Sequence, residues 1–103
     1  MNHGVVMTSM KQFIHFDAAL RYGSFAQAAR ALGVTSQAIS NSISALERDL
    51  GYALFERDGR RIAPTEDALR IAPATQQVVN SFHTLEEIAR RDDCTMDDYA
   101  EVS

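Results

Sequence analysis

Residues 23–57 read GSFAQAARALGVTSQAISNSISALERDLGYALFER, and this stretch decides the fold. Ser24 has the hydroxyl of a helix N-cap, and the alanine-rich segment after it has high helix propensity. Gly33 stands where that helix must end, because glycine accepts the left-handed conformation that closes helices. A second run of helix-forming residues covers 36–50 and stops at Gly51. The stretch therefore predicts a helix, a tight turn and a second helix.

The second helix, expected over 36–50, has two unlike faces. Thr35 or Ser36 caps its start, and its apolar side chains recur at helical spacing from Ile39 to Leu50. The opposite face carries small hydrogen-bonding side chains, whereas an ordinary solvated face is richer in Glu and Lys. Such side chains suit the reading of base edges and phosphates in the major groove of DNA. The candidate DNA-reading residues on this face are Ser36, Gln37, Ser40, Asn41 and Ser44.

A two-stranded wing is predicted directly after this helix. Residues 54–57 have the composition of a short strand, Asp58 and Gly59 are a hairpin turn signal, and residues 60–63 can return as the partner strand. Guanidinium groups near the tip of such a hairpin can enter a minor groove or bind the phosphate backbone, although a solvated basic turn is the alternative interpretation. The arginines near this tip are Arg57, Arg60 and Arg61.

A further helix is expected upstream, over residues 10–21. Its larger apolar side chains, Phe13, Phe16 and Leu20, are expected to face inward and to pack on the two helices that follow. At 103 residues, the chain is long enough for one small domain with a modest core and an extension.

The extension is predicted to be a long helix over residues 66–91, with Thr65 as its N-cap. Pro73 falls early enough in it for a kink or a lost hydrogen bond to be tolerated. A helix of about 25 residues extends roughly 37 Å, which is more than so small a domain can cover. Its apolar residues have the 4-3-4-3-4 spacing of a helix pair and predict a homodimer seam; the alternatives are packing on its own domain or on a C-terminal domain. The candidate dimerisation residues are Ile71, Val78, Phe82 and Leu85.

Taken together, these motifs resemble the DNA-binding domain of LysR-type transcriptional regulators. The sequence carries GSF, AA, L, V, S, I, ALE, LG, LFER and R in that order, and then PT before a long helix, so that the likeness covers residues 10–89. It implies a mainly α fold, a winged helix-turn-helix of three helices and a two-stranded wing, followed by a long linker and dimerisation helix. It also implies DNA contacts by Thr35, Ser36, Gln37, Ser40 and Asn41 from the recognition helix, and by Arg57 and Arg60 from the wing.

The chain departs from the family pattern at several positions. The recognition helix of the family often opens with Ser-Gln-Pro-Ala, where residues 35–38 read TSQA. Arginines are common at the positions of Asn41 and Ser44, so the predicted recognition face has no formal positive charge. The linker helix opens with TEDA at residues 65–68 and lacks the glycine of the family's Thr-x-Ala-Gly. These departures leave the predicted fold intact and leave the operator sequence open.

The net charge of −4 is distributed unevenly along the chain. Residues 10–70 contain eight basic and seven acidic side chains, whereas residues 92–103 contain five acidic ones and no Lys or Arg. Such acidic tails are usually solvated and disordered. Because the domain itself is barely basic, its affinity for DNA is expected to depend on a few arginines and on two domains binding together.

The sequence offers no catalytic constellation. Cys94 is the only cysteine, so no internal disulfide can form, which fits a reducing cytoplasm. The three histidines are far apart and make no metal-ligand spacing with Cys94, and no phosphate loop or nucleophile elbow is present. There is no apolar run long enough to cross a membrane. We therefore expect no enzymatic activity, no metal and no cofactor.

The predicted organisation is a flexible leader over 1–9, a winged helix-turn-helix over 10–65, a linker helix over 66–91 and a disordered acidic tail over 92–103. The predicted function is sequence-specific transcription regulation in the cytoplasm by a homodimer bound to double-stranded DNA. An effector ligand, if one exists, would bind a C-terminal domain absent from this chain. The alternative is a protein-interaction module that dimerises with a full-length relative without binding DNA. Other winged-helix regulator families are disfavoured by the pairing of LFER with PT.

Overall fold

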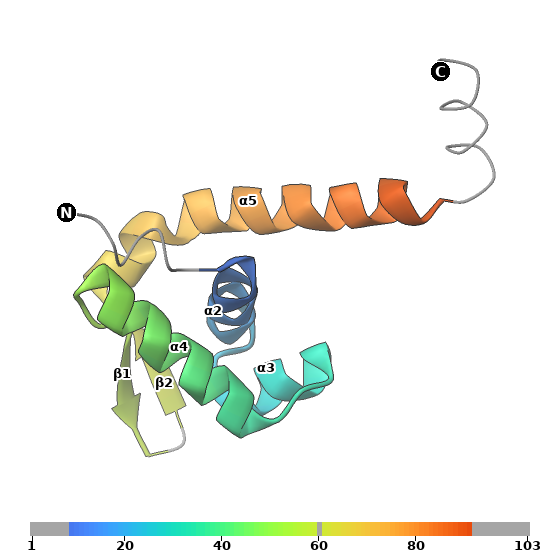
Figure 1. The fold of residues 1–103 in the computed structure, drawn as a ribbon. Helices are drawn as coiled ribbons and strands as arrows, with labels where there is room; N and C mark the ends of the chain where they lie inside the picture. The colour runs from blue at the N-terminus through green and yellow to red at the C-terminus, as the bar shows by residue number, and fades with distance from the viewer. Residues whose placement is uncertain (1–8, 60, 92–103) are drawn as a thin grey trace.

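The computed structural model describes residues 9–59 and 61–91 and is mainly helical. The first three helices and the hairpin pack into one body, and Figure 1 shows the last helix extending from it as a long rod. This arrangement confirms the predicted winged helix-turn-helix with a long linker helix. Within the described residues, no helix combines the length and the apolarity needed to span a membrane. The elements are α2 (Met10–Tyr22), α3 (Phe25–Leu32), α4 (Ser36–Leu50), β1 (Phe55–Asp58), β2 (Arg61–Pro64) and α5 (Glu66–Arg90).

The ends of the helices follow the predicted capping signals. The side chains of Ser24, Thr35 and Thr65 each accept a hydrogen bond from the backbone N–H three residues on, at 3.0, 3.0 and 3.1 Å. Gly33 and Gly51 close α3 and α4 in the left-handed region, with φ values of 72° and 88°. Because both ends of α4 are fixed locally, its predicted bounds of 36–50 are confirmed.

Helix α2 begins at Met10, as predicted, and ends at Tyr22, one residue later than predicted. Ser9, expected to belong to the flexible leader, is the N-cap of this helix. Its hydroxyl accepts a bond from Gln12 N at 3.4 Å, and Gln12 Oε1 accepts one from Ser9 N at 3.0 Å. This reciprocal pair is a capping box, which the spacing Ser-x-x-Gln could have indicated. The remainder of the predicted leader and the predicted acidic tail lie outside the described residues.

The wing is an antiparallel pair of strands placed one residue later than predicted. Phe55 lies opposite Pro64 at its base, and Asp58 lies opposite Arg61 at its tip. The shift has a physical cause, because the first expected strand residue, Leu54, gives its N–H to a side chain instead of to the partner strand.

The acceptor in this interaction is Glu47, in the last turns of α4. Its Oε2 accepts bonds from Leu54 N at 2.7 Å and from Phe55 N at 3.3 Å. In addition, Thr65 Oγ1 donates to Ala53 O at 2.8 Å. Bonds to a charged carboxylate are stronger than neutral ones, so Glu47 firmly joins the end of α4 to the wing. The wing is thereby held at a fixed place beside the recognition helix.

The core lies between α2, α3 and α4 and is closed by the base of the wing. The side chains of Phe16, Ile39, Ile43, Leu46 and Leu54 are fully buried there. The predicted inward-facing residues of the first helix are confirmed, since Phe16 is buried and Phe13 and Leu20 pack against the cluster. Burial of each large apolar side chain contributes about 1.5–3 kcal/mol to stability, which gives this small domain a rigid scaffold.

Helix α5 begins on this body and then leaves it. Ala68, Thr75 and Val79 are buried, and no described residue after Val79 is. Pro73 lies inside the helix, and Figure 1 shows its first turns at an angle to the remainder. The helix nevertheless continues through the proline, as the early position predicts.

One buried polar pair joins α2 to α4. His15 Nδ1 lies 2.6 Å from Ser42 Oγ, and the two residues are 5% and 8% exposed. Burial lowers the pKa of His15 from 6.5, and the nearby charge of Lys11 lowers it further. The neutral imidazole is therefore the form that fits between the two helices.

We predict that this pair makes the domain less stable in acid. Because the pKa of His15 is lower in the folded chain than its ordinary value of 6.5, the unfolded chain takes up the proton first. Stability is therefore complete above pH 6.5 and decreases as the pH falls below this value. Chemical denaturation at about pH 7.5 and about pH 5.5 measures the difference. The double variant His15→Leu, Ser42→Ala should lose most of it; an undiminished difference in that variant would contradict the assignment.

Candidate nucleic-acid interface

The outer face of α4 is a polar stripe. Its inner face buries Ile39 and Ile43, whereas Gln37, Asn41 and Ser44 are exposed on the opposite side. Gln37 and Asn41 are also bonded to each other, since Gln37 Nε2 donates to Asn41 Oδ1 at 2.9 Å. The structure thus gathers three of the predicted DNA-reading residues on one accessible surface, which we call the α4 stripe.

The other predicted residues of this segment lie at its margin. Ser36 is exposed at the first turn of α4, and Ser40 is half-buried. Thr35 is exposed, but its hydroxyl oxygen already accepts the capping bond from Ala38 N. Thr35 can still donate its hydroxyl proton outward, while its acceptor capacity is partly used by the helix.

Two exposed arginines were missed by the prediction. Arg48 continues the α4 stripe one turn after Ser44, so that the stripe ends in a positive charge. The spacing of 37, 41, 44 and 48 could have indicated this position. Arg30, on α3, lines an open groove to which Ser36 also belongs.

An open groove of about 710 Å³ lies between the start of α3, the start of α4 and the wing. Its polar and charged lining comes from all three elements, and Ser36 belongs both to the groove and to the start of the recognition helix. The groove therefore reaches the first turn of α4, directly before Gln37 of the α4 stripe. The lining residues of interest are Ser24, Gln27, Arg30, Ser36, Arg57 and Arg61.

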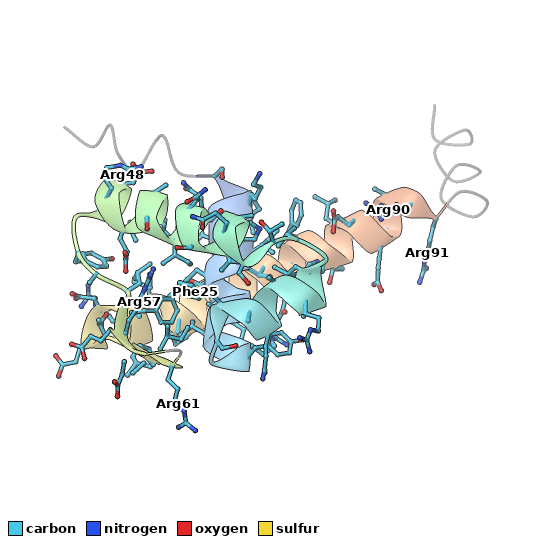
Figure 2. All side chains as sticks on the ribbon, turned by 90° about the horizontal axis from the view of Figure 1, so that it is seen from below. Phe25, Arg48, Arg57, Arg61, Arg90 and Arg91 are labelled. Carbon is cyan, nitrogen blue, oxygen red and sulfur yellow. The ribbon has the colours of Figure 1, made fainter. Side chains whose placement is uncertain are left out.

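Arg57 is held in place at the edge of this groove. Its guanidinium carbon lies 4.8 Å from the centroid of the Phe25 ring, a cation–π contact. The Phe25 ring in turn meets Phe55 edge-on at 5.9 Å, and Phe55 meets Phe16 at 5.7 Å. A chain of aromatic rings thus connects Arg57 to the core. Figure 2 shows Arg57 beside Phe25.

The second described wing arginine is placed differently. Figure 2 shows Arg61 pointing away from the body of the domain. Among the described residues, neither Arg57 nor Arg61 makes an ion pair with a carboxylate. Both guanidinium groups therefore keep their hydrogen-bond donors available for an external anion. Arg60, the third predicted arginine of the wing, lies outside the described residues.

The predicted dimerisation residues divide into two groups. Ile71 packs against the domain's own core. Further along α5, Val78 and Leu85 are 51% and 60% exposed, and Phe82 is half-buried. Ile88, one turn later, is 46% exposed. Val78 and Leu85 are thus exposed apolar side chains on a helix that extends past the domain body, and we call Val78, Phe82, Leu85 and Ile88 the α5 strip.

The sequence of the chain is similar to those of several transcriptional regulators. The HTH-type transcriptional regulator AceR of Acinetobacter baumannii is 42% identical over 71 residues, which are 69% of this chain and 24% of that protein. The HTH-type transcriptional regulator CbbR of Sinorhizobium medicae is 38% identical over 77% of this chain and 25% of its own length. The chain spans about a quarter of the length of these curated relatives.

Solved structures show the same fold. A CbnR DBD–DNA complex superposes with a TM-score of 0.70 at 28% identity, covering 80% of this chain and 94% of that one. A variant of Corynebacterium glutamicum OxyR gives a TM-score of 0.78 at 22% identity, over 84% of this chain and 28% of that chain. Residues 10–69 match the family model described as "Bacterial regulatory helix-turn-helix protein, lysR family". Because this match covers more than half of the chain, the protein belongs to the lysR family of bacterial regulatory helix-turn-helix proteins.

Proposed function

We propose that this chain binds double-stranded DNA with sequence preference, as the DNA-binding part of a LysR-type transcription regulator. The observation that carries the proposal is that the α4 stripe begins directly after Ser36, which lines the groove together with Arg30, Arg57 and Arg61. A polar helix face beside guanidinium groups can satisfy base edges and phosphates at once. The likeness to the DNA-bound CbnR domain over 94% of that domain supports it.

In the proposed complex, α4 lies in the major groove and the wing contacts the flanking backbone or minor groove. Gln37, Asn41 and Ser44 face base edges, whereas Thr35, Ser36 and Ser40 lie close enough to the helix start to bind phosphates. Arg57 and Arg61 neutralise phosphates beside the wing, and the sequence adds Arg60 to them.

We further propose that two copies act together through α5. The α5 strip is apolar, its Val78 and Leu85 are more than half exposed, and it extends past Val79, the last buried residue among those described. Pairing of two such helices would place two domains on two half-sites, and the second domain would then bind at a high effective concentration. The domain boundaries implied are 10–65 for DNA binding and 66–91 for dimerisation. The same proposal implies a cytoplasmic protein without catalytic activity.

The proposal is tested by fluorescence anisotropy of the chain on a palindromic promoter-like duplex and on a scrambled duplex, over a series of salt concentrations. Tighter binding to one duplex, with affinity that falls steeply as salt rises, is expected, and the slope counts the phosphate contacts. If a sample shown to be folded by circular dichroism binds neither duplex at low salt, DNA binding is refuted. A protein-interaction module that dimerises with a full-length relative would then be the better account.

A further inference from the structure

The two amide side chains of the α4 stripe form a fixed pair. Gln37 and Asn41 are both exposed and lie one turn apart, and Gln37 Nε2 donates to Asn41 Oδ1 at 2.9 Å. This bond orients the amide plane of Asn41, because its oxygen must face Gln37 and its Nδ2 must then point the other way. An exposed asparagine would otherwise sample several rotamers and both amide orientations.

An oriented amide matches one base better than the others. Adenine presents N7 as an acceptor and the N6 amino group as a donor in the major groove, whereas guanine presents two acceptors, N7 and O6. An amide oxygen accepts two hydrogen bonds, so Asn41 Oδ1 can bind adenine N6 while it keeps its bond from Gln37. Its Nδ2 can donate to adenine N7 at the same time. With guanine, Oδ1 would face O6, and two acceptors would be opposed.

The charges around this pair favour the same base. Guanine is usually read by the two donors of an arginine or lysine. Residues 35–44 contain neither, and the next basic residue on the α4 stripe is Arg48, seven residues and about 10 Å further along the helix. The position that Asn41 faces is therefore reached by an amide and by no cationic side chain of α4.

We infer that Asn41 reads an adenine in each half-site and that Gln37 is a positioning residue that holds the Asn41 amide for this contact. The inference rests on the proposed DNA binding and adds to it the kind of base that the recognition helix selects. Because the family often has arginine at this position, the asparagine is expected to change the preference at one base pair from G·C to A·T.

The test uses the whole chain and a pool of duplexes with randomised half-site positions, from which bound molecules are recovered and sequenced. For the unaltered chain, one position in each half-site should show A·T enriched about tenfold or more over G·C. Asn41→Ala should abolish the preference at that position alone, and Asn41→Arg should shift it to G·C. All other positions should keep their preferences.

A second variant tests whether the hydrogen bond from Gln37 is needed to orient Asn41. Gln37→Met removes the donor but keeps a side chain of similar length and high helix propensity. Besides the preference at the base that Gln37 itself faces, it should lower the A·T preference severalfold at the same position as Asn41→Ala, with an unchanged salt slope. The matched controls are Gln77→Met and Asn80→Ala, which alter exposed amides of α5 and should change nothing.

The outcomes distinguish a failure of the Asn41 inference from a failure of the proposed DNA binding. Binding with a sequence preference that the Asn41 variants leave unaltered overturns the inference and leaves DNA binding in place. A loss of preference with Asn41→Ala but not with Gln37→Met overturns the positioning role of Gln37. Failure of the folded, unaltered chain to select any duplex from the pool overturns the proposed function itself.

Discussion

The double variant Arg57→Ala, Arg61→Ala is expected to bind DNA about 10²- to 10⁴-fold more weakly than the unaltered chain, since each charged hydrogen bond to a phosphate contributes about 1.5–3 kcal/mol. Each lost phosphate contact should also reduce the slope of log K against log salt by about 0.9. The two guanidinium groups border the same groove, and the described residues offer them no carboxylate partner. Fluorescence anisotropy over a salt series measures both effects.

The matched control removes the same charge from the far end of the molecule. Figure 2 shows Arg90 and Arg91 near the end of α5, remote from Arg57 and Arg61. The variant Arg90→Ala, Arg91→Ala should therefore keep most of the affinity and of the salt slope. Equal losses in both double variants would mean that only net charge matters, and no loss in the wing variant would favour the protein-interaction module. Thermal unfolding of both variants checks that the fold is intact.

The sequence predicted those parts of the fold that depend on neighbouring residues. Ser24, Thr35 and Thr65 cap helices through bonds to the third residue on, and Gly33 and Gly51 end helices through their own backbone conformation. These interactions span a few residues, so their signals are contained in short motifs. For the same reason, the exposed residues of the α4 stripe followed from helical periodicity alone.

Interactions between distant residues were not predictable in this way. The bond between His15 and Ser42 links positions 27 residues apart, and nothing in the local pattern of either helix indicates it. The strands began one residue late because Glu47 takes the N–H of Leu54, which depends on how α4 meets the wing. The packing of Ile71 against the core was likewise not predictable. Helical periodicity shows which residues share a face, but it does not show which other element that face contacts.

The second large effect is expected from a charge placed in the α5 strip. The variant Leu85→Glu is expected to convert a dimer into a monomer, because it would place a charge in an apolar seam. Leu85 is 60% exposed in the single chain, so the monomer fold should tolerate the change. Phe82→Glu should act in the same way. Sedimentation velocity measures the oligomeric state, and Gln77→Glu, which adds the same charge at an exposed position of α5 outside the four strip residues, is the control. An unchanged dimer in both seam variants would refute the proposed seam.

Dissociation should weaken binding to a duplex with two half-sites by about 10²–10⁴-fold, because the second domain no longer binds at a high effective concentration. Binding to a duplex with one half-site should hardly change, since the α4 stripe and the wing are intact in Leu85→Glu. The contrast between the two duplexes separates the contribution of dimerisation from that of the DNA-contacting surface. Equal weakening of binding to the two duplexes by Leu85→Glu would mean that α5 stabilises the fold of the domain and does not pair two domains. The near-neutral domain would then have to bind DNA as a monomer.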